Sequence, residues 1–159
     1  MWTALFSCAA ASIQFIQGRS RPRRVLSQGR LVELETRRVP AAIVSGNLQI
    51  AGTNRSDTVV VDDMFVNGQD VVRVVQNGYT QFFSASAITG EIRFWGYKGN
   101  DIFDYAGTFD TYVDAGSGND SIYGGDGWDY ILGGDGHDVI EGWGGDDILM
   151  GGMGNDLLD

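Results

Sequence analysis

The feature that most constrains this chain is a run of nine-residue repeats in its C-terminal part. Five consecutive nonapeptides align without a gap from Ala115 to Asp159, and an earlier copy, GYKGNDIFD, begins at Gly96. A degenerate stretch that is one residue too long, YAGTFDTYVD, separates this early copy from the others. A repeat this short cannot bury an apolar face by itself, so the copies are expected to stack on one another.

Each copy follows the pattern GGxGxDxUx, in which U is large and apolar, so that six turn residues precede three strand residues. Glycine dominates positions one, two and four, where the backbone must adopt positive φ and let its carbonyl oxygens crowd inward. The middle residue of a three-residue strand points away from its two neighbours, and we expect position eight to fill the interior. Its occupants are all apolar: Phe103, Ile122, Ile131, Ile140, Leu149 and Leu158.

Position six is aspartate in every in-pattern copy: Asp101, Asp120, Asp129, Asp138, Asp147 and Asp156. The pattern resembles the RTX, or haemolysin-type, family of calcium-binding repeats over about forty per cent of the chain. This resemblance implies an all-β protein with a right-handed parallel β-roll, in which two nonapeptides make one turn and the loops lie on alternate edges. An array of solvated turns without metal is the alternative, but it does not explain why position six never varies while position five does.

The resemblance also implies that Ca²⁺ lies between loops two copies apart. Calcium takes ~6–8 oxygen ligands at ~2.3–2.6 Å, which the carboxylates and carbonyls of two loops can supply. We expect three or four ions, between Asp120 and Asp138, Asp138 and Asp156, Asp129 and Asp147, and Asp101 and Asp120. The last pair depends on whether the extra residue, which we place near Asp114, disturbs the register. The implied carbonyl ligands belong to Gly116, Gly118, Gly124, Gly125, Gly127, Gly133, Gly134, Gly136, Gly142, Gly144, Gly145, Gly151, Gly152 and Gly154.

The charge of the chain supports a cation in the repeats. Residues 96–159 hold one basic residue, Lys98, against 14 acidic residues, whereas residues 1–44 carry a net charge of +5 and residues 45–95 one of −2. A compact segment this acidic repels itself unless a cation lies among its carboxylates. The same charge excludes nucleic acid as a partner, and it predicts that calcium binding and folding are one event.

Residues 1–44 are expected to form a basic targeting segment that is poorly structured or a short helix. The apolar stretch 1–16 is shorter than the ~20 residues of a membrane span. An N-terminal export motif of the LEPRxLL type is similar to this segment, with Thr36 where the motif has proline; the matching residues are Leu31, Glu33, Leu34, Glu35, Arg37, Pro40 and Ala41. The alternative is an amphipathic helix over residues 26–38 that ends before Pro40.

Residues 45–95 have the composition of a small antiparallel β region. Strands are expected over residues 48–50, 58–61, 71–76, 79–83 and 91–95. Asn77-Gly78 suits a type I′ hairpin turn because both residues tolerate φ > 0, and Asn67-Gly68 is a second tight turn. Residues 52–60 resemble a worn copy of the nonapeptide.

Positions seven and nine of the repeats should face solvent, yet several are apolar: Tyr130, Leu132, Val139, Ile148, Met150 and Leu157. We expect this outer stripe to pack on the middle β region, on a second copy of the chain, or on residues outside it. Self-association through this apolar outer face is therefore one expected partner interaction.

The chain contains no HExxH, GxSxG or GKS/GKT motif, and its single histidine, His137, occupies position five of a repeat as an exposed loop residue. We therefore expect no enzyme, but a secreted or cell-surface calcium-binding module with a structural or adhesive role. The alternative is the calcium-dependent secretion and folding module of a larger exported enzyme or toxin, of which this chain is a fragment. An enzyme acting on extracellular polysaccharide would need a set of carboxylates outside the repeat positions, and the sequence offers none.

Overall fold

The computed structural model describes residues 24–27, 30–33 and 41–159, which divide into two units that are described separately. In the first unit, β1 (Arg24–Ser27) and β2 (Arg30–Glu33) pair as an antiparallel hairpin. The alternative of a helix over residues 26–38 is wrong wherever the backbone is described. Gly29, the fourth residue of that segment, has a helix propensity about 1 kcal/mol poorer than alanine. Most residues of the export-like motif lie outside the described part of the chain.

The second unit is built almost entirely of strands, with one 3-10 helix, η1 (Ala85–Ala87). Its strands are β3 (Ala41–Val44), β4 (Asn47–Ala51), β5 (Thr58–Val66), β6 (Gln69–Gln76), β7 (Tyr79–Ser84), β8 (Ile92–Trp95), β9 (Ile102–Ala106), β10 (Thr111–Ser117), β11 (Ser121–Gly125), β12 (Asp129–Asp135), β13 (Val139–Trp143), β14 (Ile148–Met153) and β15 (Leu157–Leu158). They form a six-stranded sheet in the order β14-β12-β10-β8-β4-β3 and a seven-stranded sheet in the order β15-β13-β11-β9-β5-β6-β7.

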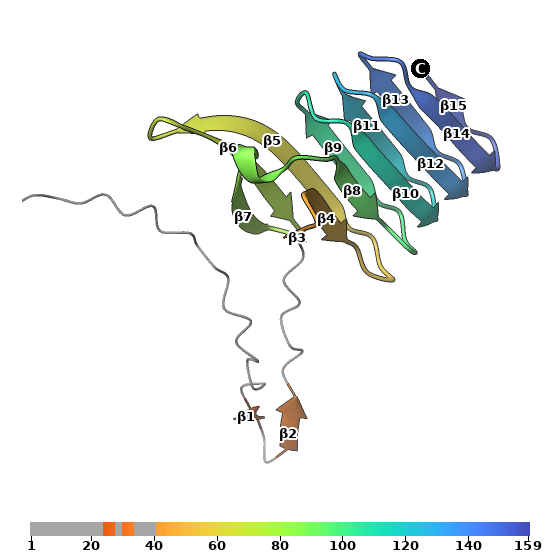
Figure 1. The fold of residues 1–159 in the computed structure, drawn as a ribbon. Helices are drawn as coiled ribbons and strands as arrows, with labels where there is room; N and C mark the ends of the chain where they lie inside the picture. The colour runs from red at the N-terminus through yellow and green to blue at the C-terminus, as the bar shows by residue number, and fades with distance from the viewer. Residues whose placement is uncertain (1–23, 28–29, 34–40) are drawn as a thin grey trace, which may run out of the picture. The chain divides into compact units, whose positions relative to one another are not determined.

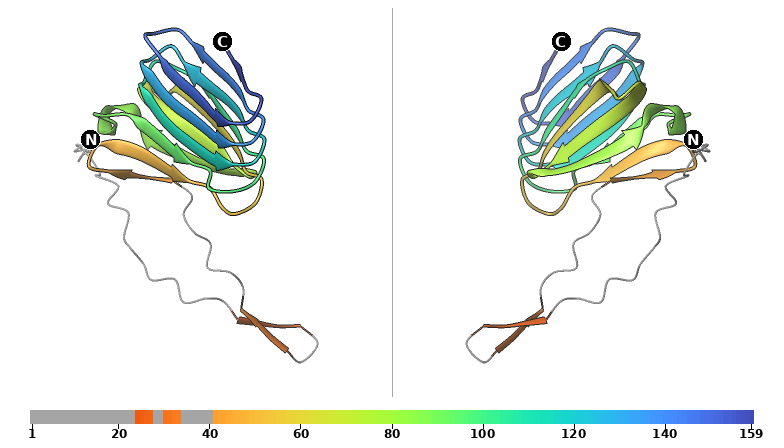
Figure 2. Two further views of the ribbon diagram at one scale, coloured as in Figure 1. Left: turned by 90° about the vertical axis from the view of Figure 1, so that its right-hand side faces the viewer. Right: turned by 90° about the vertical axis from the view of Figure 1, so that its left-hand side faces the viewer.

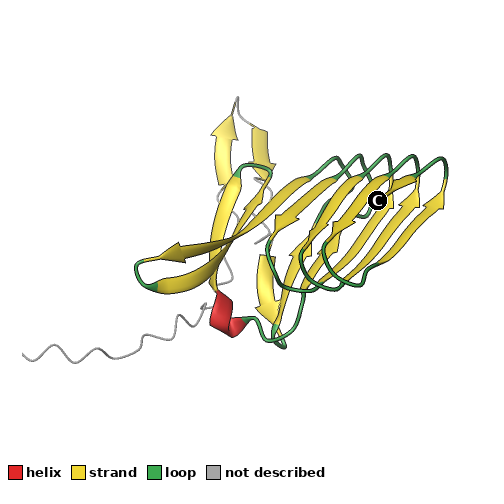
Figure 3. Cartoon of the chain, turned by 90° about the horizontal axis from the view of Figure 1, so that it is seen from above, coloured by secondary structure: helices red, strands yellow, loops and turns green. Residues whose placement is uncertain are grey.

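From β8 onward, successive strands alternate between the two sheets, and the chain winds into a β-solenoid of about four turns (Figures 1 and 3). Ile122 pairs with Ile140 in one sheet, and Ile131 pairs with Leu149 in the other. Each turn in this part therefore takes 18 residues, or two nonapeptides. The parallel β-roll that the repeats predicted is confirmed.

The extra residue of the degenerate copy lies in a different place from the one expected. Tyr112 pairs with Arg93 and Ser121 with Ile102, so both sheets take a 19-residue step at this point. Both steps contain the connection between β9 and β10, and the added residue is accommodated there, where a loop tolerates it. Asp114 itself is in regular register with Trp95 and Leu132, so the expected disturbance near Asp114 is wrong.

The middle region completes the N-terminal turns of the solenoid. β4 pairs in parallel with β8, and β5 pairs in parallel with β9, while β3–β4 and β5–β6–β7 are antiparallel. The predicted turns are confirmed, because Asn77 and Gly78 adopt φ of 50° and 79° and Asn67 and Gly68 adopt 51° and 81°. This region therefore extends both sheets rather than forming a separate antiparallel unit (Figure 2).

The core runs along the solenoid between the two sheets. Ile122, Ile131 and Ile140 at position eight are at most 1% exposed, and Phe103 stacks on Phe94 with ring centroids 5.3 Å apart. Leu158, on β15 at the edge of the seven-stranded sheet, is 40% exposed. Within the described residues, none of the helical structure has the length and apolarity that a membrane crossing requires.

The apolar outer residues lie on two faces rather than in one stripe, because successive strands belong to different sheets. Tyr130, Leu132, Ile148 and Met150 lie on β12 and β14 of the six-stranded sheet, whereas Val139 and Leu157 lie on β13 and β15 of the other. The middle region continues these sheets and does not cover them.

The position-eight side chains Ile140 and Leu158 are buried to different extents, so truncation to alanine should affect stability differently at the two positions. Ile140→Ala should lower the free energy of unfolding of the calcium-loaded protein by about 2–5 kcal/mol, because it leaves a cavity between packed turns. Leu158→Ala should cost about half of that or less, because its side chain is already partly hydrated. Chemical denaturation of both variants measures the difference, and equal losses would contradict this account of the core.

Candidate functional site

The turn residues of the repeats form two rows of loops, one along each edge of the solenoid (Figure 3). The first edge carries the loops 52–57, 96–101, 115–120, 133–138 and 151–156, and the second edge carries 105–111, 124–129 and 142–147. Consecutive loops approach so closely that only glycine fits at position four. A Cβ on Gly136 would clash with the carbonyl oxygen of Gly118, and Gly136 also adopts φ of 151°.

The position-six aspartates are linked into a ladder by their own backbone. Along the first edge, the amide of each aspartate donates to Oδ1 of the next: Asp57 to Asp101 and Asp101 to Asp120 at 2.7 Å, Asp120 to Asp138 at 2.8 Å, and Asp138 to Asp156 at 3.0 Å. Along the second edge, Thr111 donates to Asp129 at 2.9 Å and Asp129 to Asp147 at 3.0 Å. The structure therefore brings the predicted aspartate pairs together on the predicted edges.

The second carboxylate oxygen has no such partner at four of these positions. Oδ2 is buried and without a hydrogen-bond partner in Asp101, Asp120, Asp129 and Asp138. A buried carboxylate oxygen without a donor costs free energy unless a cation lies beside it. These four aspartates are the repeat aspartates whose loop has another loop stacked after it.

Backbone carbonyls lie beside the same oxygens. A Cβ added to Gly133 would lie 2.5 Å from Asp138 Oδ2 and 2.6 Å from the carbonyl oxygen of Gly151, so both oxygens face one small space. The corresponding space at Gly124 is bounded by Asp129 Oδ2 and by the carbonyl of Gly142. Oxygen-only surroundings of this kind suit a hard divalent cation such as Ca²⁺.

The other predicted carbonyl ligands are placed less uniformly. The carbonyls of Gly116, Gly118, Gly127, Gly134 and Gly136 lie against glycines of the next loop, and that of Gly125 accepts a hydrogen bond from the amide of Gly144. Gly144, Gly145, Gly152 and Gly154 belong to the loops 142–147 and 151–156, the last of each edge in the described residues. Within the described residues, no three His, Cys, Asp or Glu side chains gather as a metal cluster, so a cation bound here would take most of its ligands from carbonyls.

Burial makes these carboxylates hard to ionise when no cation is bound. Burial, with a smaller contribution from the neighbouring aspartates, raises the pKa of Asp101 from 3.8 to about 7 and that of Asp120 to about 6. Burial likewise raises the pKa of Asp129 to about 6, and it raises the pKa of Asp138. The backbone amides that donate to Oδ1 oppose these shifts only in part.

The first edge begins with an aspartate that sequence reasoning did not include in the site. Asp57 Oδ2 accepts hydrogen bonds from the amide of Thr53 at 2.6 Å and from its hydroxyl at 2.9 Å, and Oδ1 accepts one from the Asn77 side chain. Oδ2 of Asp57 therefore has hydrogen-bond donors from the protein, whereas the buried Oδ2 atoms of the repeat aspartates have none. The signal was the resemblance of residues 52–60 to the repeat, which places Asp57 at position six and Val59 at position eight.

The second edge begins with Thr111, which occupies position six of the degenerate copy and is fully buried. Tyr105, at position one of the same loop, is also fully buried, and its hydroxyl accepts a hydrogen bond from the Phe109 amide at 2.9 Å and donates one to Asp63. A phenol ring thus fills space that a glycine leaves open in other loops. The extra residue hid this alignment in the sequence.

Position five forms an outer ladder of its own. The amide of His137 donates to Asn119 Oδ1, and His137 Nδ1 accepts from the amide of Asn155, both at 2.9 Å. His137 is exposed, as expected, and its ring serves the same role as the asparagine side chains in neighbouring loops.

Comparison with known proteins agrees with this geometry. Residues 105–140 and 130–158 match the family model of the RTX calcium-binding nonapeptide repeat, in four copies. No curated protein and no solved structure matches the chain.

The raised pKa values predict an unusual pH dependence for the metal-free protein. An aspartate whose pKa is higher in the folded than in the unfolded state contributes stability below pH 3.8 and loses it as the pH rises through about 7, the value of Asp101. In EDTA, β-structure should therefore form in acid and be lost toward neutral pH. Circular dichroism against pH measures this, and greater metal-free stability at neutral pH than at acid pH would contradict it.

Proposed function

Residues 105–158 carry RTX calcium-binding nonapeptide repeats, and on that basis we propose that the second unit is a β-roll that folds around four Ca²⁺ ions. Three ions lie along the first edge, at Asp101, Asp120 and Asp138, and one lies along the second edge, at Asp129. The observation that carries this proposal is the set of four buried Oδ2 atoms without a hydrogen-bond partner. For Asp101, Asp129 and Asp138, a backbone carbonyl of the next loop lies near this oxygen.

In each proposed site, the two aspartates of a pair have different roles. At the site of Asp138, Oδ2 is a direct ligand, together with the carbonyl of Gly151 and further carbonyls of the two loops. Asp156 holds these loops in register, because its Oδ1 accepts the Asp138 amide at 3.0 Å. Asp147 has the same anchoring role opposite Asp129. Carbonyls then complete the ~6–8 oxygens that calcium takes.

The proposed consequence is that calcium decides whether the repeats are folded. The 14 acidic residues of 96–159 oppose compaction, and each bound Ca²⁺ offsets two negative charges at the place where carboxylates are buried. Millimolar extracellular calcium would then give a folded module outside the cell. This supports a secreted or cell-surface protein with a structural or adhesive role rather than a catalytic one, and RTX repeats are themselves a non-catalytic module.

The alternative role, a calcium-dependent folding and secretion module of a larger exported enzyme or toxin, uses the same four sites. The two roles differ in what the β-roll is covalently joined to. An in-frame catalytic domain in the gene would decide for the second role.

Calorimetric titration of the full chain with Ca²⁺ should give about four ions per chain, the number of unpartnered buried carboxylate oxygens. Circular dichroism should show β-structure appearing over the same calcium range, because binding and folding are coupled. The proposal fails if the protein keeps all of its β signal in EDTA and takes up no calcium at millimolar supply.

A matched pair of substitutions tests the ligand assignment. Asp138→Asn replaces a buried carboxylate by a neutral amide, so the variant should bind one ion fewer or bind it at least about tenfold more weakly. The same variant should be no less stable than the parent in EDTA, because it also removes a buried charge. Asp135→Asn is the control, since Asp135 is exposed in the same loop and its loss changes the net charge equally. Equal calcium affinities in the two variants would contradict the assignment.

A further inference from the structure

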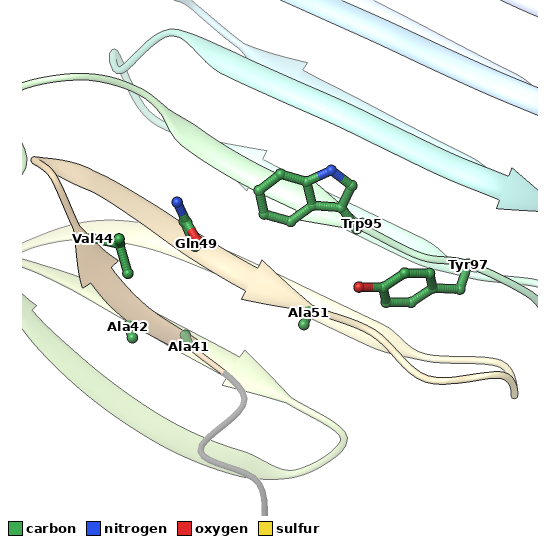
Figure 4. A pocket seen from close by; sticks show the side chains of 7 residues that line it. All are labelled: Ala41, Ala42, Val44, Gln49, Ala51, Trp95 and Tyr97. Carbon is green, nitrogen blue, oxygen red and sulfur yellow. The ribbon is translucent and has the colours of Figure 1, made fainter. Parts of the chain in front are cut away.

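An open pocket of about 270 Å³ lies on the outer face of the six-stranded sheet, over its N-terminal end. β3 and β4 contribute alanines, Val44 and Gln49, while Trp95 at the end of β8 and Tyr97 in the following loop contribute aromatic rings (Figure 4). Outward-facing side chains form most of its lining, and its aromatic end flanks Gly96, which adjoins Asp101 Oδ2. The calcium sites do not account for it.

The shape of the pocket follows from the strand register. On one side of β4, Ala51 pairs with Trp95 of β8. On the other side of β4, Gln49 pairs with Ala42 of β3. The large side chain of Trp95 therefore lies beside the small side chains of Ala42 and Ala51. The open space that this leaves against the indole ring is called the ledge. No charged side chain lines this ledge, although the adjoining repeats are strongly acidic.

Tyr97 is held in a backbone conformation that its side chain disfavours. It occupies position two of its loop with φ of 70°, where Gly116, Gly134 and Gly152 follow on the same edge with φ of 99°, 107° and 101°. A bulky residue in this region costs on the order of 1–3 kcal/mol. Its side chain is 53% exposed, so burial does not offset that cost.

The pocket adjoins a row of aromatic side chains that crosses the face. Trp95 is followed by Tyr112 on β10, with ring centroids 6.5 Å apart, and then by Tyr130 on β12, at 5.5 Å with the two rings nearly parallel. Trp128 lies 6.5 Å from Tyr130. A ligand bound in the pocket would therefore meet further aromatic edges and hydroxyls along the neighbouring strands β8, β10 and β12, which suits a chain-like ligand.

We propose that this face binds a neutral polysaccharide, with one pyranose ring in the pocket. A pyranose has an apolar C–H face, which stacks on the indole of Trp95, and a rim of hydroxyls, which the Gln49 amide can meet as both donor and acceptor. The Tyr97 hydroxyl supplies a second polar contact from the opposite wall. The volume of about 270 Å³ lies just below the ~300–1,000 Å³ of ligand pockets, and it suits one ring. The lining carries no charge and the adjoining repeats are acidic, so a neutral sugar is favoured over an acidic one.

The test uses the full chain in saturating calcium. Calorimetric titration with cellohexaose, mannohexaose and maltohexaose should show binding to at least one of them, and an oligogalacturonate of similar length should bind more weakly because it is acidic. Trp95→Ala should weaken binding about tenfold or more, the contribution of one stacked aromatic ring.

A pair of glycine substitutions separates binding from folding. Tyr97→Gly should weaken sugar binding about tenfold and at the same time raise the melting temperature, because it relieves backbone strain. Trp143→Gly is the matched control: Trp143 also occupies position two with φ of 70° and is 56% exposed, but it lies away from the pocket. It should raise the melting temperature and leave sugar binding unchanged.

Several outcomes would overturn the proposal while the calcium sites stand. They are normal calcium uptake with no binding of any of the three neutral sugars, binding of an oligoproline peptide instead of sugars, and unchanged sugar affinity in Tyr97→Gly. Calcium titration of the same samples reports on the metal sites independently, so a failure of those sites is distinguishable.

Discussion

The stacking of buried aspartate carboxylates is the interaction on which the rest of this fold depends. Each repeat aspartate uses Oδ1 to accept the amide of the preceding loop, which fixes the spacing and register of the turns. Where a loop follows, the same contact buries Oδ2 without a donor, as at Asp120 and Asp138. A carboxylate in that state is stable only when it is protonated or beside a cation. The geometry that builds the solenoid is therefore also the geometry that demands a ligand.

The first, N-terminal member of each ladder differs from the later ones. This difference explains why the proposed metal sites do not extend into the first turn. At Asp57, hydrogen bonds from Thr53 and Asn77 satisfy the carboxylate without a cation. At Thr111, an uncharged residue takes the place of the aspartate, and the ring of Tyr105 occupies the loop. Repeat arrays need such caps, because an end repeat has a neighbour on one side only. The N-terminal turn thus supplies protein donors to its own aspartate, and it offers the repeats a surface on which to stack.

The nine-residue period predicted the roll, the buried position eight and the facing aspartate pairs, because each follows from strict local repetition. The first turn was not predicted because β6, β7 and η1 are inserted within it, so Asp57 and Asp101 are 44 residues apart rather than 18. The extra residue was misplaced for a related reason: the pattern shows that a residue has been added but not which loop absorbs it. The hairpin Arg24–Glu33 was missed because helical and strand patterns are hard to distinguish over so few residues.

The same register that aligns the oxygens also aligns the side chains on the outer faces. Tyr112 and Tyr130 stack because they are register partners 18 residues apart, and Trp95 meets Tyr112 diagonally across β8 and β10, where its own register partner is Asp114. None of these contacts exists in an unfolded chain, since no two of the residues are close in sequence. If calcium is required for the turns to stack, it is also required for the aromatic row and for the ledge beside Trp95. A ligand of that face would then be bound only where calcium is abundant, which would make the metal sites a control on recognition as well as a source of stability.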